Sequence, residues 1–152
     1  MFSWFGKKSF VPYTKVADFA VHLKDGRIMG SVCKSCGYRT FPPRADCPEC
    51  MSGDFAFTEY DGKGEVYTFT RTTAAPTGFE DVAPYTVVVV ELAPGGRLVG
   101  WLGETLDHAT VRIGDPVQVV PRIWGEGEEI KLYFTVEAPG TTWHRSPAPH
   151  LG

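Results

Sequence analysis

The sequence predicts a mainly β protein: an N-terminal helix and a rubredoxin-like zinc ribbon, followed by a five-stranded barrel of the OB-fold type. Two Cys-x2-Cys pairs lie close together, which predicts the ribbon. Short apolar runs separated by turn residues follow them, which predicts the barrel. The expected divisions are an N-terminal arm and helix in residues 1–26, the ribbon in 27–54, the barrel in 55–137 and an irregular tail in 138–152.

The N-terminal helix is expected between Lys15 and Lys24. Apolar residues recur there at helical spacing and share one face: Val16, Phe19, Ala20 and Leu23. Thr14 can cap the start, and Gly26 favours a stop because glycine tolerates the left-handed conformation that follows many helices. The preceding residues 1–13 are rich in aromatic side chains. We expect this arm either to fold back on the core or to pack against a partner chain.

Eight segments read as strands. Two belong to the ribbon, Arg27–Val32 and Tyr38–Phe41; six follow, at Phe55–Tyr60, Gly64–Thr73, Tyr85–Leu92, Arg97–Leu102, Pro116–Ile123 and Lys131–Val136. The turn at 94–96 is Pro-Gly-Gly and predicts a hairpin. The run Thr86–Val90 is apolar at nearly every position, so we expect a central strand that is covered on both faces.

The cysteines have the spacing C-x2-C-x10-C-x2-C, formed by Cys33, Cys36, Cys47 and Cys50. Each pair can form a turn that presents two sulfurs to one ion, and two such turns complete the tetrahedral thiolate set that suits zinc. A rubredoxin-like iron site, or a site that has lost its metal, are the alternatives. Four protein ligands leave no position for water or substrate, so the predicted role is structural.

Charge and composition narrow the functional classes. Residues 1–63 carry nine Lys and Arg against seven Asp and Glu, whereas residues 64–152 carry six against eleven, a net charge of −5. This acidic second half disfavours a phosphate-backbone binder. The sequence has no secretory signal and no apolar run long enough for a membrane span, so we expect a cytoplasmic protein. In a reducing compartment the paired cysteines favour metal over disulfides.

Three runs carry a resemblance to a known family. They are Cys33–Gly37, Phe41–Arg44 and Cys47–Cys50, and the Phe-Pro-Pro-Arg run between the cysteine pairs is the most specific. These runs resemble the zinc ribbon of the acyl-CoA-associated proteins first catalogued as domain of unknown function thirty-five. The barrel half is also similar, so the resemblance covers roughly residues 14–137. It implies an N-terminal helix, a ribbon and an OB fold in that order.

The resemblance also implies a function. Family members are small partners of thiolase-superfamily enzymes, or are joined to acyl-CoA hydratase-like domains. The implied role is a non-catalytic accessory subunit in a hetero-oligomer, docked on a catalytic subunit and helping to form its acyl-CoA site. The candidate contacts with acyl-CoA or the partner are Phe41, Arg44 and Phe79, the last in the long loop 76–84. A coenzyme A thioester would then be a ligand of the complex.

The residue types also favour catalysis by another chain. All four cysteines are assigned to the metal, so no thiol nucleophile remains. The histidines His22, His108, His144 and His150 fall in no recognisable catalytic motif. Cations that could hold coenzyme A phosphates are sparse: Arg44, Arg71, Arg97, Arg112 and Arg122. Two alternatives remain, a nucleic-acid-binding ribbon and OB-fold protein, and a stand-alone enzyme with an unfamiliar site.

Overall fold

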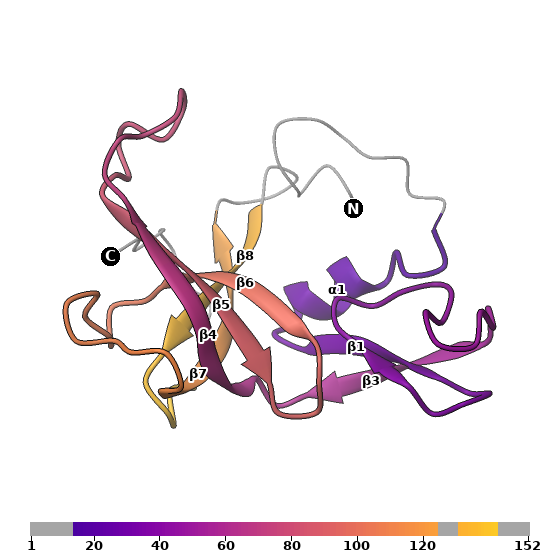
Figure 1. Ribbon diagram of the computed structural model, residues 1–152. Helices are drawn as coiled ribbons and strands as arrows, with labels where there is room; N and C mark the ends of the chain where they lie inside the picture. The colour runs from indigo at the N-terminus through magenta and orange to yellow at the C-terminus, as the bar shows by residue number, and fades with distance from the viewer. Residues whose placement is uncertain (1–13, 125–130, 143–152) are drawn as a thin grey trace.

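The computed structural model describes residues 14–124 and 131–142. Two β units lie side by side in it, a small sheet with a helix and a closed barrel (Figure 1). This is the predicted fold class, with the elements in the predicted order. The arm 1–13 and the end of the tail, including Trp143, lie outside the described residues. Within the described ranges, no helix is long and apolar enough to cross a membrane.

The helix α1 spans Phe19–Lys24 and is shorter than expected. The residues before it form tighter turns, in which the N–H of Ala17 donates to the carbonyl of Thr14. Two residues of α1, Ala20 and Leu23, are fully buried and pack against the barrel residues Ile123 and Leu132. The short helix therefore owes its position to this packing rather than to its own propensity.

The small sheet contains β1 (Ile28–Cys33), β2 (Arg39–Thr40) and β3 (Phe55–Tyr60), in the order β2-β1-β3. All of its pairs are antiparallel, and β3 pairs with β1 along its whole length. The strand at 55–60 thus belongs to the ribbon's sheet, not to the barrel where the sequence had placed it. Apolar alternation marks a strand but carries no information on which strand it pairs with.

The barrel has five strands, β4 (Lys63–Thr72), β5 (Tyr85–Leu92), β6 (Arg97–Leu102), β7 (Pro116–Trp124) and β8 (Lys131–Glu137). Their order is β4-β5-β6-β8-β7, and β7 pairs with β4 to close the barrel. The pair β6–β8 is parallel and the other neighbours are antiparallel. The predicted hairpin joins β5 to β6, and a bulge at Tyr67 interrupts the pairing of β4 with β5.

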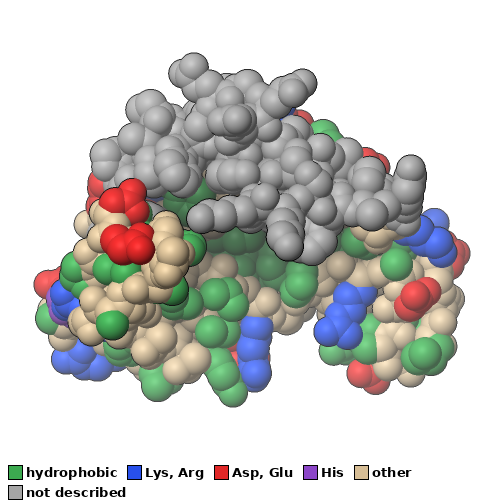
Figure 2. Space-filling model, turned by 90° about the horizontal axis from the view of Figure 1, so that it is seen from above, with side chains coloured by type: hydrophobic (Ala, Val, Ile, Leu, Met, Phe, Trp, Pro, Cys, Tyr) green, Lys and Arg blue, Asp and Glu red, His purple; other side chains and the backbone are tan. Residues whose placement is uncertain are grey.

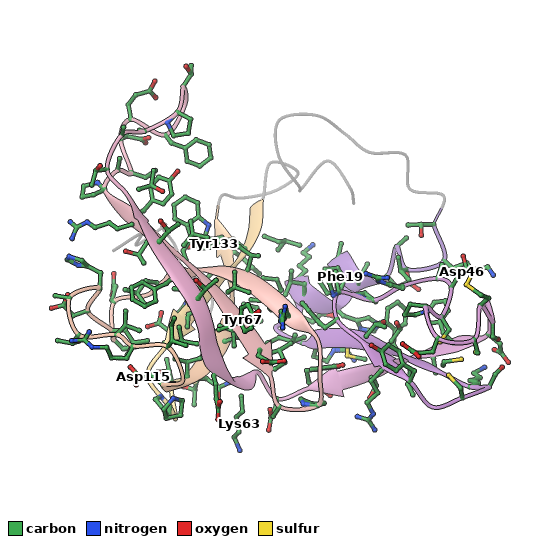
Figure 3. The ribbon with its side chains drawn as sticks, in the orientation of Figure 1. Phe19, Asp46, Lys63, Tyr67, Asp115 and Tyr133 are labelled. Carbon is green, nitrogen blue, oxygen red and sulfur yellow. The ribbon has the colours of Figure 1, made fainter. Side chains whose placement is uncertain are left out.

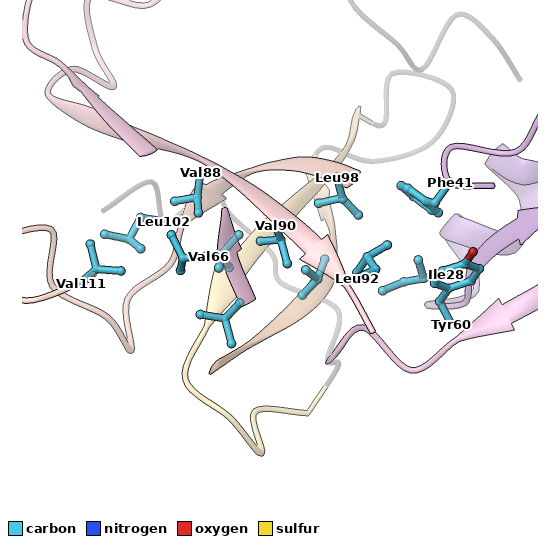
Figure 4. Packing of buried hydrophobic residues seen from close by; sticks show 13 residues of the cluster. Ile28, Phe41, Tyr60, Val66, Val88, Val90, Leu92, Leu98, Leu102 and Val111 are labelled. Atoms are coloured by element: carbon cyan, nitrogen blue, oxygen red, sulfur yellow. The ribbon is translucent and has the colours of Figure 1, made fainter. Parts of the chain in front are cut away.

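One hydrophobic core joins the two units. Its centre is a set of almost wholly buried valines, Val66, Val88, Val90, Val119 and Val136. The same cluster continues without a break into Ile28, Phe41 and Tyr60 of the ribbon (Figure 4). The ribbon is therefore packed against the barrel, and the two units share one hydrophobic core.

Phe41 lies at this joint. Its ring contacts Phe19, Tyr60 and Phe134, with centroid separations of 6.0, 5.7 and 6.2 Å. The β5–β6 hairpin reaches the same point, because a Cβ added to Gly96 would lie 2.8 Å from the Cβ and backbone nitrogen of Phe41. The absence of a side chain at Gly96 is what lets the hairpin touch the ribbon.

We expect Gly96→Ala to destabilise the protein more than Gly95→Ala does. Both glycines have φ near +100°, so alanine carries a similar backbone cost at each. Only Gly96 also meets Phe41, whereas a Cβ at Gly95 meets nothing within 4 Å. Overpacking of this kind adds about 1–3 kcal/mol. Chemical denaturation of the two variants measures the difference, and equal losses would contradict a close joint at Phe41.

The strand β5 is central, as predicted, but its two faces differ. Thr86, Val88 and Val90 point inward and are buried. Val87 and Val89 point outward and are only half-buried. The expectation that β5 is covered on both faces is thus wrong for the part of the chain described by the structure, because nothing there packs fully on the outer face.

Candidate metal centre

The four cysteine sulfurs gather at one point. All of them lie within 4.8 Å of one another. The Sγ atoms of Cys33 and Cys50 are 3.6 Å apart, and those of Cys36 and Cys47 are 3.5 Å apart. Sulfurs at the corners of a tetrahedron around zinc, with bonds of about 2.3 Å, are separated by about 3.8 Å. The donor set and its spacing therefore fit a tetrahedral thiolate site.

Backbone hydrogen bonds shape each pair into a matching turn. The N–H of Gly37 donates to the carbonyl of Cys33 at 2.8 Å, and the N–H of Met51 donates to the carbonyl of Cys47 at 2.9 Å. Both turns need a left-handed residue at this position, with φ of +77° at Gly37 and +62° at Met51. The sulfurs lie at the end of the ribbon far from the barrel, near Asp46 (Figure 3).

The neighbouring sulfurs disfavour ionisation of all the thiols at once when no cation lies among them. The backbone amide of Cys36, together with that of Ser35, lowers the pKa of Cys33 to about 6. The pKa of Cys36 is raised to about 12: the backbone amide of Tyr38 lowers it, but desolvation and the neighbouring sulfurs outweigh that effect. A divalent ion would offset the repulsion between the thiolates, which is consistent with a metal site.

The candidate contact residues do not share one site. Phe41 is only 8% exposed in the interdomain joint, which argues against its contacting a ligand or partner directly. Arg44 is exposed, and its backbone N–H donates to the Ser31 hydroxyl at 2.9 Å, which fixes the chain between the cysteine pairs. Phe79 is 39% exposed in the β4–β5 loop, with its ring stacked on Trp101.

The barrel arginines are mostly engaged within the chain. Arg97 lies over the ring of Tyr67, at 3.7 Å from its centroid, and Arg112 donates to backbone carbonyls of its own loop. Arg122 is buried and pairs with Glu137 at 3.1 Å, so it is structural and not a phosphate ligand. Arg71 contacts His108, which also pairs with Asp107 at 3.2 Å; these three residues line a cavity of about 220 Å³ at one end of the barrel.

Sequence reasoning missed the buried group around Glu137. This carboxylate is 2% exposed, and it accepts hydrogen bonds from the backbone N–H and hydroxyl of Thr105. Burial raises the pKa of Glu137, but the bonds from Thr105, Thr135 and Arg122 outweigh burial and hold it below the usual range. A Cβ on Gly103 would overlap the carboxylate. The signal available in the sequence was a pair of opposite charges, Arg122 in one predicted strand and Glu137 directly after the next.

Two family models match the chain. Residues 21–56 match the rubredoxin-like zinc ribbon domain of ChsH2, and residues 57–122 match the C-terminal OB-fold domain of ChsH2. Together they cover well over half of the chain. The four clustered cysteines lie inside the ribbon match, which supports a structural zinc ion.

Relatives and a solved structure agree with these matches. A DUF35 domain-containing scaffold protein of Methanothermobacter thermautotrophicus is 36% identical over 104 residues, covering 67% of this chain and 77% of that protein. A protein of Thermomonospora curvata described as a "probable enoyl-CoA hydratase alpha subunit" is 38% identical over 96 residues, which are 62% of this chain and 29% of that protein. The solved "Ltp2-ChsH2(DUF35) aldolase" matches with a TM-score of 0.66 and 28% identity, covering 84% of this chain and 98% of that one.

Proposed function

We propose a function on the basis of the family to which this chain belongs, the DUF35 family. The chain combines a ChsH2-type zinc ribbon with a ChsH2-type OB fold. We infer that it is a non-catalytic accessory subunit of a thiolase-type acyl-CoA enzyme complex. It docks on the catalytic subunit and helps to form the acyl-CoA site. One candidate for such an accessory subunit is the small subunit of benzoylsuccinyl-CoA thiolase.

The observation that carries the proposal is the engagement of all four thiols in one closed cluster. The sulfurs of Cys33, Cys36, Cys47 and Cys50 fit one tetrahedral ion, and such a set leaves no open coordination position. The chain has no other cysteine to act as a nucleophile. Its relatives include scaffold proteins and a solved aldolase that pairs a DUF35 protein with Ltp2, which favours chemistry in another chain.

In this proposal zinc holds the ribbon's shape. The ligands are Cys33, Cys36, Cys47 and Cys50, supplied by two turns that face each other across the sheet end. The metal adds folding free energy to a unit whose own sheet has only three strands. The ribbon in turn sets the position of Phe41 and the joint with the barrel.

The acyl-CoA contacts in this proposal are few. Arg44 offers one exposed cation on the ribbon, and Phe79 offers an exposed ring on a loop that projects from the barrel (Figure 1). Arg97, Arg112 and Arg122 are engaged within the chain. The catalytic subunit therefore supplies most of the phosphate contacts, and this chain covers part of the acyl-CoA.

The purified chain alone is expected to show no thiolysis of acetoacetyl-CoA. When it is coexpressed with a thiolase-superfamily protein of its own source organism, we expect a stable complex that elutes as one species in size-exclusion chromatography with light scattering. Turnover by the isolated chain would contradict the accessory role, as would failure of every such thiolase to bind it.

The nucleic-acid alternative has a separate test. A groove for single-stranded nucleic acid needs clustered cations beside stacked aromatic rings. Here Arg97 lies over the ring of the exposed Tyr67, and the cross-strand neighbour of Arg97 is the acidic Glu91. We expect no mobility shift of labelled single-stranded DNA at low salt. A salt-dependent shift would favour this alternative over the enzyme complex.

A further inference from the structure

The outer faces of the barrel are covered unequally. On β7 and β8 the outward residues Arg122, Thr135 and Glu137 are buried. Thr105, in the segment after β6, donates to Glu137, and Arg122 donates to Thr135 and Glu137. On β4, β5 and β6 the residues of the described ranges supply no such cover. Val99, which points outward from β6, is 62% exposed.

The uncovered residues form a continuous apolar surface. In the strand register Val99 lies directly opposite Val89, and Trp101 lies directly opposite Val87. Tyr67, at the β4 bulge, is 44% exposed, and the guanidinium of Arg97 on β6 lies over its ring, so Tyr67 adjoins this surface. Isolated exposed apolar residues are ordinary, but neighbouring ones on adjacent strands mark an interaction surface.

Aromatic rings continue this surface toward the projecting loop. Tyr85 packs on Trp101 with centroids 4.4 Å apart, and Phe79 stacks on Trp101 at 6.0 Å with its plane inclined by only 15°. Phe79 thereby ties the loop after β4 to the sheet. We call the seven residues Tyr67, Phe79, Tyr85, Val87, Val89, Val99 and Trp101 the outer barrel face. Figure 2 shows hydrophobic side chains in the hollow beside the loop.

The rim of the outer barrel face is acidic. Glu65 and Glu91 lie opposite each other on β4 and β5, and both are exposed. Glu80 and Asp81 are the two charged residues of the loop 73–84, and acidic side chains stand at its tip (Figure 2). Two basic residues share the outer side of these three strands in the described ranges. Arg97 lies over the ring of Tyr67, and Lys63, at the start of β4, pairs with Asp61 at 3.6 Å.

We propose that the outer barrel face is the surface by which this chain docks on its catalytic subunit. The occupant is a protein surface with an apolar centre and a rim of Lys and Arg, which complements the rim of Glu65, Glu80, Asp81 and Glu91. Apolar burial supplies the affinity, and the charged rim speeds association. This proposal rests on the proposed accessory function. It also accounts for the outward-facing valines Val87 and Val89 of β5, which would become buried in the complex.

The test measures binding of the full chain to the thiolase-superfamily protein that forms the complex. Val99→Glu places a carboxylate at the centre of the outer barrel face, and we expect the Kd to rise by about 100-fold. Asp81→Lys is expected to slow association several-fold at low salt, with the difference shrinking as salt rises. The control is Val21→Glu, at an exposed apolar residue of α1, a helix that packs on Ile123 of β7 and Leu132 of β8. Its Kd should match that of the unsubstituted chain.

Val99→Glu is expected to fold normally, because the Val99 side chain points into solvent. Denaturation curves and zinc content check this. If Val99→Glu binds as tightly as the unsubstituted chain, the outer barrel face is not the docking surface, while the accessory function stands. If the unsubstituted chain binds no thiolase, both proposals fall. If the chain self-associates and Val99→Glu alone makes it monomeric, the occupant is a second copy and the proposal is overturned.

Discussion

Cys47→Ser is expected to remove the bound zinc and to unfold the ribbon. A serine hydroxyl is a poor replacement for a thiolate, and the remaining three sulfurs would leave one corner of the tetrahedron open. Structural zinc contributes about 10–16 kcal/mol of apparent binding free energy to small domains of this kind at neutral pH. The ribbon's three-stranded sheet has little else to offset that loss. Elemental analysis of the purified chain should change from one zinc per chain to none.

The effect should extend beyond the ribbon. Ile28, Phe41 and Tyr60 of the ribbon share one core with the barrel, so disorder in the first unit exposes apolar surface on the second. We therefore expect lower stability of the whole chain in chemical denaturation. Met51→Ser is the matched control, because it places serine in the same turn at a side chain that is 78% exposed. Retention of one zinc by Cys47→Ser would refute the ligand assignment, and one iron in the unsubstituted chain would favour the rubredoxin-like alternative.

Glu137→Gln is expected to destabilise the chain by about 3–5 kcal/mol at neutral pH. The substitution removes the carboxylate that pairs with the buried guanidinium of Arg122 at 3.1 Å, and breaking a buried ion pair by removing one partner is costly. Thermal or chemical denaturation measures the loss. Glu65→Gln, at an exposed position on β4, serves as the control and should change stability by less than about 0.5 kcal/mol. A Glu137→Gln effect as small as that of Glu65→Gln would contradict the assigned ion pair.

The same pair predicts a pH dependence. The folded-state pKa of Glu137 is held below the usual value of 4.5, so its contribution to stability is fully present above that value. The contribution is lost as the pH falls through the lowered folded-state pKa. The stability difference between the unsubstituted chain and Glu137→Gln should therefore be constant near neutral pH and shrink under acid conditions. The double variant Arg122→Met/Glu137→Gln, which removes both charges, should recover part of the loss.

Much of this molecule followed from local sequence patterns. The helix, the hairpin at 94–96 and most strand limits could be predicted, because apolar periodicity and turn residues act over a few neighbouring positions. The metal ligands could be proposed for a similar reason: the two turns that present Cys33, Cys36, Cys47 and Cys50 are local, and the residue types state the chemistry.

Two features depended on tertiary structure alone. The pairing of β3 with β1, and the burial of Phe41 and Arg122, follow from which segments meet in space, and strand alternation does not encode the partner. The run Thr86–Val90 illustrates what the sequence predicted and what the tertiary structure decided. Its sequence predicted apolar contacts on both faces, because exposing apolar side chains to water costs free energy. Only the folded barrel decided that one face is filled from within and that the other is left facing outward, beside Val99 and Trp101.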